Sequence, residues 1–177
     1  MVYILLVDGF EEIEALTPLD ILRRCEVPVK TVGVFGKKVT GSHNITVEAD
    51  ILIDEVDHSD MELLMLPGGP GYPNYDKSEE VSALISYANE NEIYISAICA
   101  APSVIGKRGL LAGKKATCFP GFEEFLIDAQ VVSDKAVIDG KFITGKGAGA
   151  ASEFGFLMAE TLAGKEIAEK IKKSMQY

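Results

Sequence analysis

The order of two hydrophobic patterns along the chain is the strongest constraint on its fold. Continuous apolar runs of strand length, such as residues 2–7, alternate with segments whose apolar residues recur at the spacing of one helix face, such as residues 78–91. Strands that are apolar throughout are typical of a parallel sheet, because the helices that connect parallel strands bury both of its faces. The alternation therefore predicts an α/β fold with a mostly parallel central sheet between two layers of helices.

The expected elements follow one another without an internal repeat or a long linker, which predicts a single domain over residues 1–177. Strands are expected at residues 2–7, 29–35, 39–47 (a hairpin around Gly41), 51–53, 62–66, 93–98, 115–118, 130–133 and 142–144. Helices are expected at residues 11–25, 78–91, 122–127, 150–162 and 165–173, with another after Pro102. Because Pro18 interrupts the first helix, we expect either a kink there or a helix that begins at Pro18 with Thr17 as its cap.

Charge and cysteine content narrow the class of protein. The chain has 17 basic and 27 acidic residues, a formal net charge of −10, so we expect neither nucleic acid nor a membrane surface as a partner. The longest uncharged apolar run, residues 93–101, is too short to span a bilayer, and the apolar opening has no basic flank of the kind that precedes a signal peptide. Three cysteines cannot all pair, so we expect free thiols in the cytoplasm.

Cys99 is the first candidate site residue, because it directly follows an expected strand. A strand that ends at a cysteine before a helix is typical of the sharp turns that expose nucleophiles on α/β sheets. The small residues Ala97, Ala100 and Ala101 suit such a turn. The N–H groups at the start of the helix would favour a thiolate. The alternative is a packed, unreactive cysteine.

Two further segments follow strands whose carboxyl ends should share one edge of the sheet, which is where ligands bind on parallel sheets. Glu14 lies one turn into the first helix. It is either exposed to solvent or directed at the strand ends, where its pKa would be raised and it could donate or accept a proton. Gly68 and Gly69 follow the strand at residues 62–66, and their N–H groups can form an oxyanion pocket, although tight turns need glycine in any case.

The histidines and the other cysteines do not indicate a metal site. His43 lies in the expected hairpin and His58 in a polar run, and no group of cysteines and histidines has the spacing of metal ligands. Cys25 is expected to be a core thiol. Cys118 ends an expected strand, so it is either buried or a resolving thiol for Cys99.

Several of these segments, in their order and spacing, resemble the ThiJ/PfpI superfamily, most closely its DJ-one branch. The matching segments are GFEEIE at 9–14, LPGG at 66–69, AICAAP at 97–102, GKGAG at 145–149 and LAGKE at 162–166. The resemblance implies a flavodoxin-like three-layer sandwich that usually forms a homodimer and needs no organic cofactor or metal. It implies an enzyme of the glyoxalase or deglycase type that acts on small aldehydes and dicarbonyls under oxidative stress. Alternatively, the resemblance implies a redox sensor or chaperone that is switched by oxidation of Cys99 to a sulfinate.

The resemblance also implies roles for individual residues. Cys99 would be a nucleophile of low pKa that reacts readily with oxidants, and Glu14 would be a protonated carboxyl that hydrogen bonds its sulfur. Gly69 and Ala100 would donate backbone N–H groups to an oxyanion or to a sulfinate. Arg24 matches an arginine that relatives contribute across the dimer.

The chain departs from the superfamily pattern at positions near this cysteine. Phe119, within the stretch TCFP, stands where the branch typically has a histidine, so we expect slow turnover of dicarbonyls. Ala100 stands where the protease-like branch has a histidine, which argues against a cysteine protease. His43 lies where some relatives place an arginine close to the pocket. It therefore either carries protons or binds anions there, or is a surface histidine of the hairpin.

Overall fold

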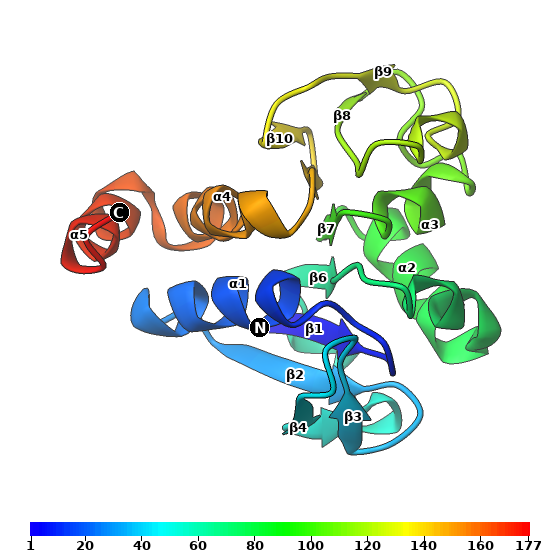
Figure 1. Ribbon diagram of the computed structural model, residues 1–177, viewed down its shortest axis with the longest axis horizontal. Helices are drawn as coiled ribbons and strands as arrows, with labels where there is room; N and C mark the ends of the chain where they lie inside the picture. Colours follow the sequence, from blue (N-terminus) through cyan, green and yellow to red (C-terminus); the bar gives the residue numbers. More distant parts are fainter.

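A seven-stranded sheet runs through the molecule with the strand order β10-β11-β7-β6-β1-β2-β5 (Figure 1). The computed structural model describes residues 1–177. Its strands are β1 (Val2–Leu6), β2 (Val29–Gly33), β5 (Ile51–Leu52), β6 (Leu63–Leu66), β7 (Tyr94–Ile98), β10 (Ala136–Asp139) and β11 (Phe142–Gly145). All neighbouring strands are parallel except β10 and β11, which form an antiparallel pair at one edge. The expected α/β fold with a mostly parallel central sheet is confirmed.

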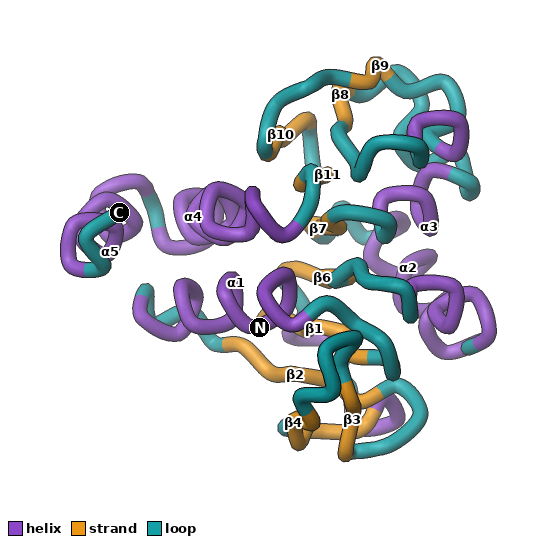
Figure 2. The backbone as a smooth tube through the Cα atoms, viewed as in Figure 1, coloured by secondary structure: helices purple, strands orange, loops and turns teal.

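Helices cover both faces of the sheet and bury two separate apolar cores. Helices α1 (Glu12–Arg24), α4 (Ala151–Ala163) and α5 (Lys165–Ser174) share one core with Val2, Ile4 and Leu6 of β1. Helices α2 (Glu79–Glu90) and α3 (Pro102–Gly106) share the other with Tyr3 and Leu5. Figure 2 shows α1, α4 and α5 grouped together, away from α2 and α3. Because successive side chains of a strand point to opposite faces, a strand that is apolar throughout supplies both cores.

Helix α1 differs from the expectation at Pro18. It is one helix that contains Pro18, so a separate helix that begins at this residue is wrong. Its N-cap is Glu11, whose carboxylate accepts the backbone N–H of Glu14 at 2.8 Å. Buried residues lie on both sides of the proline, among them Ala15 and Leu22. Their packing compensates for the one hydrogen bond that a proline cannot donate.

The smaller strands do not all join the central sheet. Strands β3 (Lys38–Thr40) and β4 (Thr46–Glu48) form the expected hairpin, whereas β8 (Lys115–Ala116) and β9 (Gln130–Val131) pair only with each other. Strand β10 lies outside the expected strands; it pairs antiparallel with β11 at the edge of the sheet, and its residues are mostly only partly buried. The expected helix at residues 122–127 is a single 3-10 turn at Glu123–Phe125. None of the helices combines the length and the apolar character that crossing a membrane requires.

The topology brings three loops to one edge of the sheet. Strands β1, β6 and β7 are neighbours at its centre and are parallel, so their carboxyl ends lie side by side. The segment after β1 leads into α1, the segment after β6 contains Gly68 and Gly69, and Cys99 directly follows β7. The site predicted from the sequence is therefore assembled by the order of the strands.

Candidate functional site

Cys99 occupies a strained turn between β7 and α3. Its backbone φ is +65°, in the left-handed region that residues with a side chain rarely adopt. Its N–H donates to the carbonyl of Gly145 at 2.9 Å, and its own carbonyl accepts the N–H of Phe119 at 2.8 Å. Helix α3 begins at Pro102, three residues after Cys99. A strained residue that presents its side chain beyond a central strand has the geometry of a nucleophile on an α/β sheet.

The loop after β6 approaches Cys99 closely, and Gly68 makes this possible. A Cβ atom at Gly68 would lie 2.6 Å from both the Cβ of Cys99 and Oε2 of Glu14, so only glycine fits there. The buried hydroxyl of Tyr75 holds the base of the loop, because it donates to the carbonyl of Pro67 at 2.9 Å. The backbone N–H groups of Gly69 and Ala100 lie close enough to the sulfur of Cys99 to favour its thiolate form. Two N–H donors thus converge on the reactive atom from different loops.

Glu14 is buried beside this sulfur, with 1% of its surface exposed, so the alternative of a solvent-exposed helix position is wrong. Its carboxylate accepts the N–H of Gly68 at 3.0 Å, and the thiol of Cys99 and the N–H of Ala148 lie close enough to favour its ionised form. Burial raises the pKa of Glu14 to about 7, and the negative charge of Glu11 adds to this effect. Glu14 can therefore hold or release a proton near neutral pH.

The protonation of Cys99 depends on that of Glu14. Burial, followed by the negative charge of Glu14, raises the pKa of the Cys99 thiol to about 12, although the N–H groups of Gly69 and Ala100 act in the opposite direction. The expectation of a low-pKa thiolate is therefore wrong while Glu14 is ionised. When Glu14 is protonated its negative charge is lost, and it can donate its proton to the sulfur. The two groups thus titrate as a coupled pair, in which a thiolate goes with a protonated Glu14.

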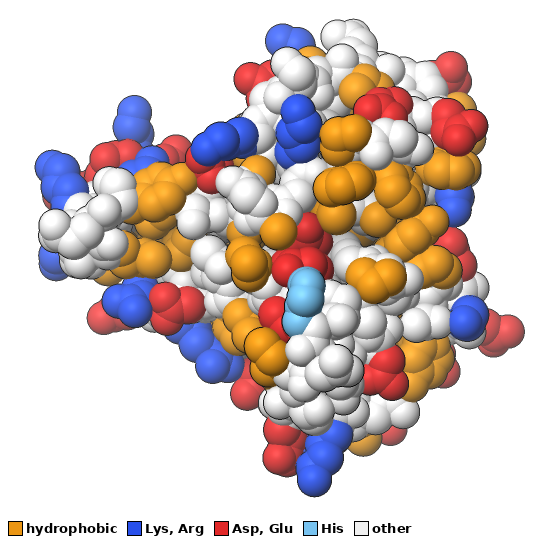
Figure 3. Space-filling model, viewed as in Figure 1, with side chains coloured by type: hydrophobic (Ala, Val, Ile, Leu, Met, Phe, Trp, Pro, Cys, Tyr) orange, Lys and Arg blue, Asp and Glu red, His pale blue; other side chains and the backbone are white.

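Cys99, Glu14, Gly69 and Ala100 line one cavity of about 510 Å³. Part of its wall is aromatic, formed by Tyr72, Phe119 and Phe122, which meet edge to face. Ser42 and His43 come from the β3–β4 hairpin, and no lysine or arginine is among the lining residues. On the face that Figure 3 shows, acidic, apolar and histidine side chains lie next to one another.

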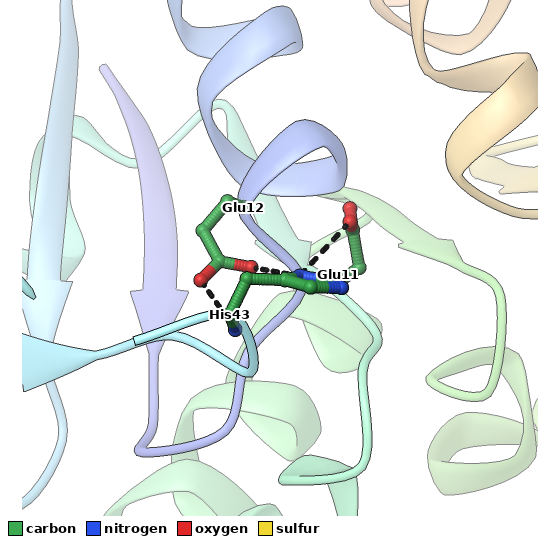
Figure 4. Close-up of side chains that lie close together, drawn as sticks. All are labelled: Glu11, Glu12 and His43. Carbon is green, nitrogen blue, oxygen red and sulfur yellow. Dashed lines mark hydrogen bonds and ion pairs between the residues drawn. The ribbon is translucent and has the colours of Figure 1, made fainter. Parts of the chain in front are cut away.

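Glu12, the first residue of α1, holds the hairpin against this helix. Its buried carboxylate accepts the backbone N–H of His43 at 2.7 Å and contacts the ring Nδ1 of His43 at 2.8 Å (Figure 4). Burial alone would raise the pKa of Glu12, but the hydrogen bonds from the side chain and backbone of His43 outweigh it and lower the pKa to about 2. No local sequence pattern reveals this contact, because the partners are 31 residues apart.

Glu11, Glu12 and His43 are the one set of side chains spaced as metal ligands could be, with one potential ligand atom from each within 4.8 Å of the others. Hydrogen bonds within the chain already account for this arrangement. The carboxylate of Glu11 caps α1, and that of Glu12 holds the hairpin. We therefore assign no metal to these residues.

Two accessory residues named from the sequence lie away from the cavity in this chain. Arg24 is at the last turn of α1, where it pairs with Asp20 at 2.7 Å. Cys118 is buried and lines a different cavity, together with Thr117 and Glu123. Burial and the charge of Glu123 raise the pKa of the Cys118 thiol to about 11.

Comparisons of sequence and of structure both point to one protein family. The sequence profile described as the DJ-1/PfpI family matches residues 1–161. Protein dj-1beta of Drosophila melanogaster is 35% identical over 97% of this chain and 94% of its own length. The crystal structure of that fly protein covers 99% of this chain and 96% of its own, with a TM-score of 0.92 and 34% identity. Protein DJ-1 homolog B of Arabidopsis thaliana is 36% identical over 94% of this chain, which spans only 39% of that plant protein.

Two similar proteins carry names that state an activity. Glutathione-independent glyoxalase DJR-1.2 of Caenorhabditis elegans is 28% identical over 93% of this chain and 89% of its own length. Deglycase TK1284 of Thermococcus kodakarensis is 29% identical over 82% of this chain and 89% of its own length. Proteins similar to this chain thus include a glyoxalase and a deglycase.

Proposed function

This chain belongs to the DJ-1/PfpI family, and from that premise we propose that it is a stress-response enzyme that converts small α-dicarbonyl compounds. Cys99 is the nucleophile, Glu14 transfers protons, and Gly69 and Ala100 donate N–H groups to the oxyanion. The reaction needs no organic cofactor and no metal. The names of the two relatives, a glutathione-independent glyoxalase and a deglycase, support this class of substrate.

The chemistry is written here for methylglyoxal. The sulfur of Cys99 adds to the aldehyde carbon and the thiol proton moves to the aldehyde oxygen, which forms a hemithioacetal. Glu14 as a carboxylate removes the proton from that carbon and returns it to the neighbouring carbon, which leaves a thioester of lactate on Cys99. Water then cleaves the thioester and restores the thiol. The balance is one methylglyoxal and one water consumed for each lactic acid formed, with no external oxidant or reductant.

The contact between the buried Glu14 and the thiol of Cys99 is the observation that supports this proposal most strongly. A carboxyl group with a pKa near 7 can both accept and donate a proton at neutral pH, as a shuttle between adjacent carbons requires. The N–H groups of Gly69 and Ala100 act on the sulfur, so an oxygen on the carbon that the sulfur attacks would develop its negative charge close to these donors.

Turnover of methylglyoxal to lactate without glutathione tests the proposal. Cys99→Ser should reduce turnover to background, and Glu14→Gln should lower kcat by about 10²–10⁴-fold, the usual contribution of a general acid or base. Cys25→Ala removes a buried thiol from the opposite end of α1 and should leave kcat unchanged. Equal turnover by wild type and Cys99→Ser would contradict the proposal.

A second candidate function is redox sensing without catalysis. Cys99 is only partly buried, whereas Cys25 and Cys118 are buried, so Cys99 is the thiol that an oxidant reaches most easily. A sulfinate there would accept the N–H groups of Gly69 and Ala100, and charge-assisted hydrogen bonds of this kind contribute roughly 1.5–3 kcal/mol each. Peptide mapping after mild peroxide should find Cys99 modified first, as sulfinate. Earlier modification of Cys25 or Cys118, or a Cys99–Cys118 disulfide as the main product, would argue against it.

A further inference from the structure

We propose that Glu12 and His43 form a carboxylate–imidazole pair in which Glu12 orients His43, and that His43 moves protons between the two substrate oxygens. This inference rests on the proposed dicarbonyl chemistry and adds the group that this chemistry still needs. Glu14 can move a proton between carbons, but the oxygen atoms of the substrate also exchange protons during the reaction. Phe119, which lines the same cavity, cannot do this, because its side chain has no exchangeable proton.

The contacts of Glu12 fix the position of the His43 ring. The carboxylate is buried at the start of α1, where it accepts the backbone N–H of His43 at 2.7 Å and the hydroxyl of Ser42 at 3.3 Å. The same carboxylate lies 2.8 Å from Nδ1 of the ring. Any side chain at Gly41 would overlap Glu12, so the glycine lets the hairpin approach this closely. Hydrogen bonds from the backbone and the side chain of the same residue leave the ring little freedom to turn away.

These contacts determine which ring nitrogen carries the proton in neutral His43. The hydrogen bonds of Glu12 keep it ionised, with a pKa of about 2, so its carboxylate can only accept. Nδ1 must therefore be the protonated nitrogen that faces Glu12. Nε2 lies on the other edge of the ring, and the side chain is 69% exposed at the cavity that also contains Cys99 and Glu14. Nε2 is thus the atom available to a substrate.

The surrounding charges favour a proton on Nε2 as well. Oε1 of Glu11 lies 3.9 Å from Nδ1, Glu12 is in contact, and Glu14 lines the same cavity, which no lysine or arginine lines. The hydrogen bond with Glu12 raises the pKa of His43, and the negative charges of Glu12 and Glu11 act in the same direction. Once it is protonated on both nitrogens, His43 is the one cationic side chain at the cavity and can donate from Nε2.

The proton balance uses His43 twice. When Glu14 removes the carbon-bound proton of the hemithioacetal, the electron pair forms a carbon–carbon double bond and the adjacent ketone oxygen takes the Nε2 proton, which gives an enediol. When Glu14 returns its proton to the second carbon, the first hydroxyl becomes the thioester carbonyl and its proton goes to Nε2. His43 and Glu14 both end as they began, so no other proton donor or acceptor is consumed.

Nuclear magnetic resonance of ring-¹⁵N-labelled protein tests the pair without using activity. The chain has two histidines, so His58→Gln assigns the spectrum. In the wild type we expect neutral His43 as the Nδ1–H tautomer, with a pKa above the 6.5 of an unperturbed histidine. Glu12→Gln removes the charge and should lower that pKa. Rapidly averaging tautomers and an unshifted pKa in the wild type would overturn the pair.

Kinetics test the role of the pair in the reaction. His43→Gln should lower kcat by about 10²-fold, within the range for loss of a general acid or base, and change KM little. Glu12→Gln should lower kcat less and shift the limb of the pH profile that belongs to His43. His58→Gln, an exposed histidine that stacks on Tyr87 outside the cavity, should leave kcat unchanged. Full kcat in His43→Gln would overturn the relay alone, whereas no turnover in the wild type would overturn the proposed function together with it.

Discussion

At the scale of single residues, two glutamates on one helix have opposite protonation behaviour. Glu14 is buried against Cys99, and burial raises its pKa to about 7. Glu12, two residues earlier, is also buried, but the hydrogen bonds from His43 lower its pKa to about 2. Two carboxyl groups whose environments move their pKa values apart can take different roles in one reaction. Here Glu14 exchanges protons and Glu12 remains a fixed negative charge.

The raised pKa of Glu14 predicts how folding stability changes with pH. Between its unfolded pKa of 4.5 and its folded pKa of about 7, the native protein binds more protons at Glu14 than the unfolded chain does. The contribution of Glu14 to the free energy of unfolding is therefore fully present below pH 4.5 and is lost as the pH rises through 7. The total loss is about 3 kcal/mol. Glu14→Gln should not show this loss, which urea denaturation at pH 4.5, 6 and 8 would measure.

A matched variant isolates this effect from other titrating groups. Glu79 is an exposed acid in the first turn of α2, so Glu79→Gln should keep the pH dependence of the wild type. If the curves of wild type and Glu14→Gln run parallel between pH 4.5 and 8, the native pKa of Glu14 is not raised.

At the scale of elements, the site depends on how closely α1 packs against α4. Helix α1 carries Glu12 and Glu14, and the segment before α4 supplies the N–H of Ala148 to Glu14. Gly155 of α4 faces α1, where an added Cβ would lie 2.9 Å from Cδ1 of Ile21 and 3.1 Å from Cα of Pro18. The small residue therefore sets the distance between the two helices and, with it, the position of both carboxylates.

We predict that Gly155→Ala destabilises the protein. In a free helix this change would be stabilising by up to about 1 kcal/mol, because alanine has the higher helix propensity. Here the added methyl group meets a fully buried isoleucine and a backbone atom, so we expect a loss of roughly 1–3 kcal/mol. Urea denaturation shows whether Gly155→Ala lowers or raises the free energy of unfolding. Gly36→Ala is the control, because nothing lies within 4 Å of its added Cβ, and a stabilised Gly155→Ala would contradict close packing.

At the scale of the whole molecule, apolar side chains remain exposed next to the site. Ile13 on α1 is 53% exposed, and Ile45 in the β3–β4 hairpin is 52% exposed. Burial of such side chains between two copies is favourable by roughly 25 cal/mol per Å² of apolar surface removed from water. The family resemblance implies a homodimer with Arg24 near the cavity of the partner, and an α1-centred interface would bury Ile13.

We therefore predict a homodimer whose interface includes α1. Light scattering at micromolar concentration should give twice the mass of the 177-residue chain, and Ile13→Lys should shift the population to monomer. Ile138→Lys changes an equally apolar, exposed residue on the edge strand β10 and should leave the dimer intact. A monomer in the wild type, or a dimer that resists Ile13→Lys but not Ile138→Lys, would contradict this interface.

Much of the fold and the place of the site follow from the sequence alone. The apolar runs and helix-period segments are local patterns, and burial on both faces of a parallel sheet is what such runs require. The apolar runs predicted β1, β6 and β7. They thereby predicted the edge of the sheet where Cys99, Glu14 and the loop with Gly68 and Gly69 meet. The order of motifs predicted the family, which the match over residues 1–161 confirms.

Tertiary structure alone decided the electrostatics of the site. The sequence suggested a low-pKa thiolate from its helix start, but burial and the charge of Glu14 raise the pKa of Cys99. It also gave no sign that Glu12 meets His43, because that contact joins α1 to a hairpin 31 residues away. A pKa depends on desolvation and on charges that are near in space, and a chain brings such groups together only when it folds. Local patterns therefore determine where the residues lie, and the packed structure determines their charge.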